Sequence, residues 1–290
     1  MKNNNRKCFL CGFTKPLKRS HIIPAFVIKY LKESSITKRL RSAIAPNKRI
    51  QDAEKKFLLC IDCEVSFSKH ETWFSKNIFY PYHNRKKVTS NYKNELLKFA
   101  VSLSWRTLIN HFDKYKELEW VINAEATYRA FLNGRIKNTK PYQHHIFFID
   151  YAYNVNTEII PEKIQWYLGR ATDGTLVHSQ NNKIIFIYNK LCKIIIVSFI
   201  SPPKNRLWKG TKIKKSGRVK TKQLVKDGLF GRFILDRAQE VSDVFKNISE
   251  RQVNKIEEDF LKNILRVEQS HSLEAFLKQK ELDNKTKNNK

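Results

Sequence analysis

Four cysteines in two close pairs are the residues of this sequence with the clearest chemistry. Cys8 and Cys11 form one Cys-x-x-Cys pair, and Cys60 and Cys63 form the other. Such a turn brings two thiolates to one metal ion at little cost in loop entropy, and zinc prefers four ligands in a tetrahedron. Gly12 permits the tight turn after the first pair. The spacing therefore predicts a structural Zn²⁺ site. Two separate buried or redox-active pairs are the alternative.

The chain between the two pairs carries a histidine that is suited to proton transfer. The pairs are 48 residues apart, so this segment is an insert that the metal would hold at both ends. It contains Ser20 and His21, and histidine can take a proton from water near neutral pH. Glu64 and Glu71 follow the second pair and would share one face of a helix there. Their carboxylates are oxygen ligands of the kind that Mg²⁺ or Mn²⁺ takes.

This order of motifs resembles the HNH endonuclease family (His-Me finger or ββα-metal nucleases) in its zinc-stabilised form. The resemblance rests on Cys8-x-x-Cys11, His21-Ile-Ile-Pro24 and Leu58-Leu-Cys60-x-x-Cys63, and it covers about residues 8–71. It implies a zinc-stapled ββα, treble-clef-like unit in which His21 is the general base that activates water. It also implies a divalent metal ion, Mg²⁺ or Mn²⁺, that binds the scissile phosphate, with Glu64 and Glu71 as candidate ligands.

The sequence departs from that family at several positions. Ser20 stands where the family usually has an acid or a histidine, and the last His or Asn is replaced by a glutamate or a serine. The window 53–56 lacks the family's middle asparagine, and Asn47 is the nearest one. An alternative therefore stays open, namely a non-catalytic zinc-finger protein that binds nucleic acid or acts as an adaptor. We interpret the remaining histidine candidates as structural or as residues at the edge of the core: His70, His83, His144 and His145.

The charge of the chain points to a polyanionic partner. The net charge is +29, from 56 basic and 27 acidic residues, which is far more than solubility requires. Lys outnumbers Arg by 40 to 16, so a Lys-rich composition inherited from an AT-rich genome also contributes. Residues 201–226 hold ten Lys or Arg and no acid. We expect the partner to be nucleic acid, and DNA rather than RNA. The expected contacts are Arg19, Arg49, Lys204, Arg206, Trp208, Lys212, Lys214, Lys215 and Arg218, with Trp208 stacking on a base.

Several features favour a cytoplasmic protein. No apolar run reaches the ~18 residues that a membrane span needs. The N-terminal residues lack the apolar segment of a secretory signal. Paired cysteines suit metal binding in a reducing compartment, and Cys192 stands alone as a buried thiol.

The pattern of elements predicts an α+β protein. We expect a zinc-bound domain at 1–90 and a larger domain at 91–290, in which helices pack on an antiparallel sheet. Gating of the nuclease by a regulatory protein or ligand, as in host-defence or mobile-element systems, is one role for the larger domain. Periodicity predicts helices at 24–32, 63–79, 94–112, 117–133 and 236–282. It predicts strands at 57–59, 145–151, 164–170, 175–178, 184–188 and 194–199. We also expect Pro81 to end a helix, Asp173-Gly174 to form a hairpin turn, and 283–290 to be a disordered tail.

Overall fold

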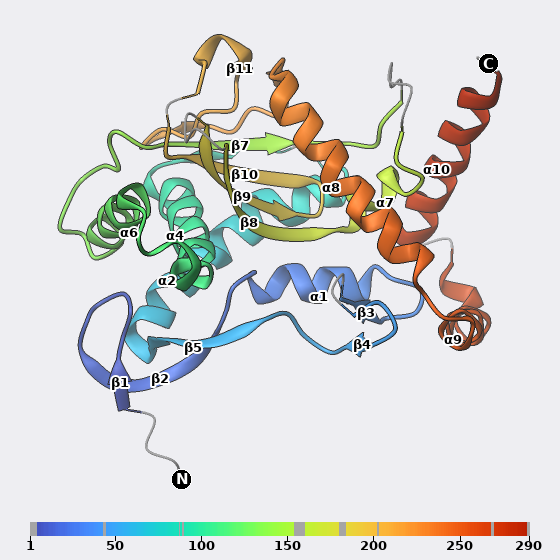
Figure 1. Ribbon diagram of the computed structural model, residues 1–290, viewed down its shortest axis with the longest axis horizontal. Helices are drawn as coiled ribbons and strands as arrows, with labels where there is room; N and C mark the ends of the chain where they lie inside the picture. Colours follow the sequence, from blue (N-terminus) through green and yellow to red (C-terminus); the bar gives the residue numbers. More distant parts are fainter. Residues whose placement is uncertain are drawn as a thin grey trace. The chain divides into compact units, whose positions relative to one another are not determined.

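The chain forms two compact units made of interleaved segments in a computed structural model (Figure 1). Unit 1 contains residues 1–24, 54–148 and 173–225, and unit 2 contains residues 25–53, 149–172 and 226–290. Each unit draws on chain from both sides of residue 90. Units defined by contacts do not report which segment folds alone, so the boundary near residue 90 stays a prediction. The structure describes residues 5–42, 45–86, 88, 90–153, 160–179, 184–201, 203–267 and 270–288.

A small antiparallel sheet followed by a helix forms the N-terminal part of unit 1. Its strands are β1 (Asn5–Lys7), β2 (Thr14–His21) and β5 (Lys55–Cys60), in the order β1-β2-β5. A bulge between Lys18 and Arg19 shifts the pairing of β2 with β5. The bulge bends the strand just before Ser20 and His21. Helix α2 (Ile61–Phe74) begins directly after Cys60, so β5 delivers the second cysteine pair as predicted.

The helix after the second cysteine pair runs past the proline that we expected to end it. A π-helical segment (Ser75–Phe79) follows α2, and α3 (Tyr80–His83) follows that segment. Pro81 lies in the first turn of α3, where a helix does not need the missing N–H. The prediction that the helix ends at Pro81 is therefore wrong. The π-helical segment is followed directly by α3, which begins at Tyr80, so Pro81 falls within the first turn of α3.

A four-stranded sheet and a central helix make the core of unit 1. The strand order is β7-β10-β9-β8, and β10 pairs antiparallel with both β7 and β9. Helix α4 (Asn94–Asn110) packs against β7, β9 and β10, and Figure 1 shows it beside the sheet. Every residue of β9 and β10 is buried, which explains their largely apolar sequences; Asn189, Lys190 and Ser198 are the buried polar residues in them. The strand bounds are Gln143–Phe148 for β7, Thr172–His178 for β8, Ile185–Leu191 for β9 and Ile194–Phe199 for β10.

The other elements of unit 1 are short apart from one helix. Helix α6 (Glu119–Leu132) confirms the helix predicted at 117–133, and it packs on α4. Asp173 and Gly174 lie inside β8 and not at a hairpin turn, so that prediction is wrong. The basic segment 201–226 adds only short strands and one 3₁₀ turn. The short elements are β6 (Asn91–Tyr92), α5 (Phe112–Tyr115), a 3₁₀ turn (Asn205–Leu207), β11 (Trp208–Lys209), β12 (Gly217–Arg218) and β13 (Leu224–Val225).

Unit 2 is mainly helical. Helix α7 (Ile164–Arg170) corrects our prediction of a strand there, because Ile164, Tyr167 and Leu168 recur at helical spacing and are buried. Helix α7 packs against α8 (Gly228–Lys246) and α10 (His271–Asn288). Helix α10 continues to Asn288, where we expected a disordered tail from 283. The remaining elements are α1 (Ala25–Glu33), β3 (Leu40–Arg41), β4 (Arg49–Ile50), α9 (Glu250–Lys262) and a 3₁₀ turn (Ile264–Arg266).

The helices and sheets together agree with the predicted α+β class. Across the described residues, no helix has both the length and the apolar character needed to cross a membrane.

Candidate metal centre and the residues beside it

The four cysteines converge on one point in unit 1. The turn between β1 and β2 supplies Cys8 and Cys11, while the end of β5 and the first turn of α2 supply Cys60 and Cys63. All four sulfur atoms lie within 4.8 Å of one another. The Sγ atoms of Cys8 and Cys63 are 3.8 Å apart, and those of Cys11 and Cys60 are 3.9 Å apart. Zn–S bonds of about 2.3 Å in a regular tetrahedron separate the sulfurs by about 3.8 Å.

The backbone around the first pair is arranged as a metal-binding knuckle. The Cys8 N–H donates to the Phe13 carbonyl at 2.9 Å, and the Gly12 N–H donates to the Cys8 carbonyl at 2.9 Å. Gly12 has a φ of 82°, in the left-handed region that favours glycine. The Cys60 N–H points at the Cys8 sulfur at 3.4 Å, as a donor would point at a thiolate. The cysteine cluster therefore fits a zinc ion in distance, burial and ligand chemistry.

Burial affects the protonation of the cluster when no metal is bound. It raises the pKa of the Cys63 thiol, with further contributions from hydrogen bonding to Cys60 and from the charge of Cys8. Zinc binds thiolates, so loading the cluster must release protons at neutral pH. Zinc binding to this cluster should therefore depend on pH.

Ser20 connects the end of β2 to the first turn of α2. Its side chain is buried, and its hydroxyl donates to the Glu64 carboxylate. The Leu59 N–H donates to the same hydroxyl at 3.3 Å. Ser20 and Glu64 therefore lie together, as their places next to the predicted base and next to Cys63 suggested. His21 follows Ser20 at the end of β2 and is half-buried.

Arg106 of α4 fixes the backbone of His21, a role that our sequence reasoning missed. Its Nη1 atom donates to the His21 carbonyl at 2.9 Å. Its Nη2 atom lies 2.6 Å from the Glu71 carboxylate, and its guanidinium stands 5.5 Å from the centre of the Phe67 ring. The Arg106 side chain is only 3% exposed. The available signal was a charged residue within the otherwise apolar run Leu103-Ser-Trp-Arg-Thr-Leu108.

The ion pair with Arg106 argues against Glu71 as a metal ligand. The Glu71 side chain is 19% exposed and carries its negative charge next to a buried cation. Within the described part of the chain, the only group of three or more His, Cys, Asp or Glu residues close enough to share a metal ion is the cysteine cluster. Glu71 therefore has a structural partner, whereas Glu64 is hydrogen-bonded to Ser20, the residue that precedes His21.

The other histidines have structural environments. Burial lowers the pKa of His70 to about 4, with a further contribution from Lys98. His83 is buried, its Nδ1 lies 2.8 Å from the Phe79 carbonyl, and its Nε2 accepts from the Lys193 N–H at 3.2 Å. Burial also lowers the pKa of His144 to about 3 and that of His145 to about 4.

Two residues noted in the sequence have partners within unit 2, namely the predicted contact Arg49 and Asn47, the asparagine nearest to the family's middle asparagine. Arg49 pairs with Asp259 at 3.0 Å and donates to the Lys255 carbonyl at 3.1 Å. The Asn47 side chain joins the start of α9, because it donates to the Asn247 carbonyl at 3.0 Å and accepts from the Ser249 N–H at 2.7 Å. These contacts give Arg49 and Asn47 a structural role.

The predicted base-stacking role of Trp208 is wrong for this structure. Its ring is 4% exposed and packs edge-on against Phe199 and His145, with ring centres 5.0 and 5.5 Å away. An indole that fills the core cannot also present its face to a base. The remaining predicted contacts are exposed and stay candidates: Arg19, Lys204, Arg206, Lys212, Lys214, Lys215 and Arg218.

Exposed aromatic rings near the cysteine cluster were also missed. Phe9 and Phe13 flank the first cysteine pair and are 51% and 67% exposed, and Phe57 on β5 is 41% exposed. Lys18 and Arg19 are exposed on β2, next to β5. Exposed rings among cations are the pattern of a surface that stacks on unpaired bases. Phe9 and Phe13 directly adjoin a metal knuckle in the sequence, and that adjacency was the available signal.

Comparisons with protein-family models, with curated proteins and with solved structures found no match.

Proposed function

We propose that the chain is a metal-dependent endonuclease that hydrolyses phosphodiester bonds of nucleic acid, with DNA as the preferred substrate. One observation carries the proposal. The Ser20 hydroxyl donates to Glu64, so the strand that ends in His21 lies against the first turn of the helix that follows the zinc ligands. This is where a base and the ligands of a hydrolytic metal ion must meet.

His21 is the proposed general base. An imidazole can take a proton from water near neutral pH, and the His21 side chain at the end of β2 is half-buried. The hydrogen bond from Arg106 to the His21 carbonyl holds the backbone in place. Arg106 is therefore a positioning residue in this scheme, and Glu71 orients Arg106.

Glu64 is the proposed protein ligand of Mg²⁺ or Mn²⁺, and the Ser20 hydroxyl that donates to it orients its carboxylate. Carboxylate oxygens suit hard cations, which keep several waters when few protein ligands are present. A bound cation of this kind would stabilise negative charge on the phosphate and on the leaving oxygen. Exposed cations such as Arg19 would hold the flanking phosphates.

The test is cleavage of plasmid DNA and of single-stranded DNA and RNA by zinc-loaded protein with Mg²⁺ or Mn²⁺. We expect His21→Ala to lower the rate at least 100-fold, because general-base catalysis contributes about 10²–10⁴-fold. The matched control is His70→Ala, which removes a half-buried imidazole from α2 and leaves His21 intact. Equal rates for the wild type and His21→Ala, or no cleavage by the wild type, would remove the proposal.

A second candidate function is a zinc-dependent nucleic-acid-binding protein without catalysis. Two observations favour it. The cysteine cluster is the only metal-binding group found among the described residues, and Glu71 is paired with Arg106. Titration of zinc-loaded protein with Mn²⁺ separates the candidates. The endonuclease binds one Mn²⁺ that is lost in Glu64→Gln, whereas the binding protein contains zinc alone.

A further inference from the structure

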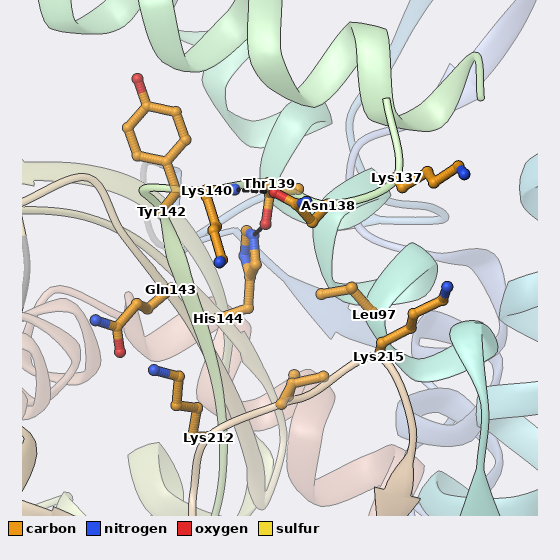
Figure 2. Close-up of a pocket in the computed structure, with 11 residues that line it drawn as sticks. Leu97, Lys137, Asn138, Thr139, Lys140, Tyr142, Gln143, His144, Lys212 and Lys215 are labelled. Atoms are coloured by element: carbon orange, nitrogen blue, oxygen red, sulfur yellow. Dashed lines mark hydrogen bonds between the residues drawn. The ribbon is translucent and has the colours of Figure 1, made fainter. Parts of the chain in front are cut away.

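A pocket rich in lysine lies at the edge of the four-stranded sheet in unit 1, and none of its residues belongs to the cysteine cluster or to the His21 site. Its volume is about 280 Å³. One wall comes from the chain between α6 and β7, the other from the basic segment 201–226, and Leu97 of α4 lies between them (Figure 2). The lining residues are Leu97, Lys137, Asn138, Thr139, Lys140, Tyr142, Gln143, His144, Lys212, Ile213 and Lys215.

Backbone hydrogen bonds hold the basic segment beside β7. The Ile213 N–H donates to the His144 carbonyl at 2.8 Å, and the Ile146 N–H donates to the Thr211 carbonyl at 2.9 Å. These bonds fix the backbone of Lys212 against the edge of β7. The position of this lysine is therefore set by the fold, even though its side chain is exposed.

The opposite wall is also fixed. The Thr139 hydroxyl lies 3.0 Å from His144 Nε2, and the Lys140 N–H donates to Asn138 Oδ1 at 3.0 Å. His144 Nδ1 lies 2.6 Å from the Ser198 hydroxyl on β10. Both ring nitrogens of His144 therefore have partners inside the protein. His144 is a rigid wall of the pocket, and the positive charge comes from the lysines.

The charged side chains that line the pocket are all positive. Four lysines line it and no carboxylate does. Figure 2 shows the side chains of Lys140 and Lys212 extending toward the space beside Gln143, with Lys137 and Lys215 on the other side of His144. Lysine binds phosphate as a point charge, and arginine binds phosphate or carboxylate through paired hydrogen bonds. A phosphomonoester carries about −1.5 to −2 at pH 7, so it neutralises this group of cations better than a single carboxylate does.

The polar lining favours a nucleotide over inorganic phosphate. Ligand pockets start at about 300 Å³, so a volume of about 280 Å³ suits a small organic phosphate. Asn138 and Gln143 offer amides, whereas the Tyr142 ring points away from this space and packs against Tyr128 (Figure 2). Gln143 Oε1 is buried and makes no hydrogen bond with the described residues. A sugar hydroxyl or a base edge would satisfy it.

We propose that this pocket binds the phosphate group of a nucleotide, either as a free nucleoside monophosphate or as the phosphorylated end of a nucleic-acid strand. The inference does not depend on cleavage at His21. It assigns Lys140 and Lys212 to the phosphate and the amide of Gln143 to the sugar or base.

Binding measured by calorimetry at fixed salt tests the proposal. The probes are AMP, adenosine, inorganic phosphate, and one oligonucleotide with a 5′-phosphate, a 3′-phosphate or only hydroxyl ends. We expect AMP or a phosphorylated strand to bind at least tenfold tighter than its unphosphorylated partner. The double variant Lys140→Gln/Lys212→Gln should remove that advantage, and Lys140→Arg/Lys212→Arg should retain most of it.

The control variant is Lys220→Gln/Lys222→Gln, which removes two exposed lysines from the same basic segment but outside the pocket. If the phosphorylated strand binds more tightly than AMP, and only the pocket variant loses this preference, the ligand is a strand end. If AMP binds more tightly than the phosphorylated strand, the ligand is a free nucleotide. Equal losses in the pocket and control variants would show general electrostatic attraction and overturn the proposal. Equal binding of AMP and adenosine together with equal binding of the phosphorylated and hydroxyl-ended strands, or no binding of any phosphate, would also overturn it.

Discussion

Replacing Arg106 with methionine should destabilise unit 1 more than a typical substitution does. Methionine retains much of the apolar stem but loses the guanidinium, which is 3% exposed and pairs with Glu71 at 2.6 Å. The substitution leaves the Glu71 charge without its partner and the His21 carbonyl without its donor. Removing one member of a buried ion pair costs about 3–5 kcal/mol. The Glu71 side chain is 19% exposed, so water partly replaces the lost partner. We therefore expect a loss of about 2–4 kcal/mol.

A double-mutant cycle with Glu71→Gln isolates the ion pair from the hydrogen bond to His21. Glu71→Gln keeps the shape of the side chain and leaves Arg106 bonded to the His21 carbonyl, but it leaves the 3% exposed guanidinium without a counter-charge, so we expect a loss comparable to that of Arg106→Met. In the double variant the unpaired carboxylate is gone, so the two losses should not add. The coupling should reach at least about 1 kcal/mol, as for residues in direct contact.

Urea unfolding of zinc-saturated protein is the assay, because urea leaves ion pairs unscreened, unlike guanidinium chloride. The reasoning would be refuted by a loss below about 0.5 kcal/mol for Arg106→Met, the range of an ordinary surface change. Strict additivity with Glu71→Gln would refute the ion pair. Arg106→Lys separates charge from geometry, since lysine cannot contact the carboxylate and the carbonyl with two forked nitrogens.

Three further predictions concern the metal, the turn and the pH dependence. Cys63→Ser, or removal of the metal by a chelator, should lower the zinc content from one per chain to near zero and lower the melting temperature, with Cys192→Ser as the control for loss of a cysteine outside the cluster. Gly12→Ala should lower the free energy of unfolding by about 1–2 kcal/mol, measured by urea unfolding, because a φ of 82° is strained for any residue with a Cβ. The control Gly228→Ala should lower it much less, because Gly228 lies at the start of a helix with open space around it. Burial lowers the pKa of His144 to about 3 and that of His145 to about 4, so the unfolded chain binds more protons than the folded one from about pH 6.5 down to those values. The free energy of unfolding should therefore fall by about 2 kcal/mol per histidine as the pH drops from 7 to 5. A His144→Gln variant whose free energy of unfolding depends on pH as steeply as that of the wild type would contradict this.

The cluster of four cysteines was the part of the candidate site that the sequence predicted best. Each Cys-x-x-Cys pair holds two sulfurs close together in a short turn, so binding of all four to one metal ion can be predicted without knowing how the insert between the pairs folds. The helices at 94–110 and 119–132 could also be predicted from the sequence, because their apolar residues recur at helical spacing. The strand predicted at 164–170 failed because aromatic and β-branched residues in a short run suit either structure, and only burial against α8 and α10 decides for a helix.

The side-chain partnerships could not be read from the sequence. Glu71 and Arg106 are 35 positions apart, and their ion pair depends on how α2 packs on α4, where Phe74 and Phe99 stack with ring centres 3.9 Å apart. Trp208 lies in the most basic segment of the chain and yet fills the core, since local composition does not show which way a ring points. The phosphate pocket joins residues near 140 with residues near 213, and that pairing along the edge of β7 is a long-range contact.

The most direct measurement of the central claim is chemical rescue of a His21→Gly variant. Removing the imidazole leaves a gap at the end of β2 that free imidazole can enter. With zinc-loaded protein, Mg²⁺ and a DNA substrate, we expect the variant to cleave at least 100-fold more slowly than the wild type, and added imidazole to restore cleavage in proportion to its neutral form. A variant that cleaves at the wild-type rate, or one that stays inactive with imidazole while its fold and zinc content are unchanged, would contradict His21 as the base.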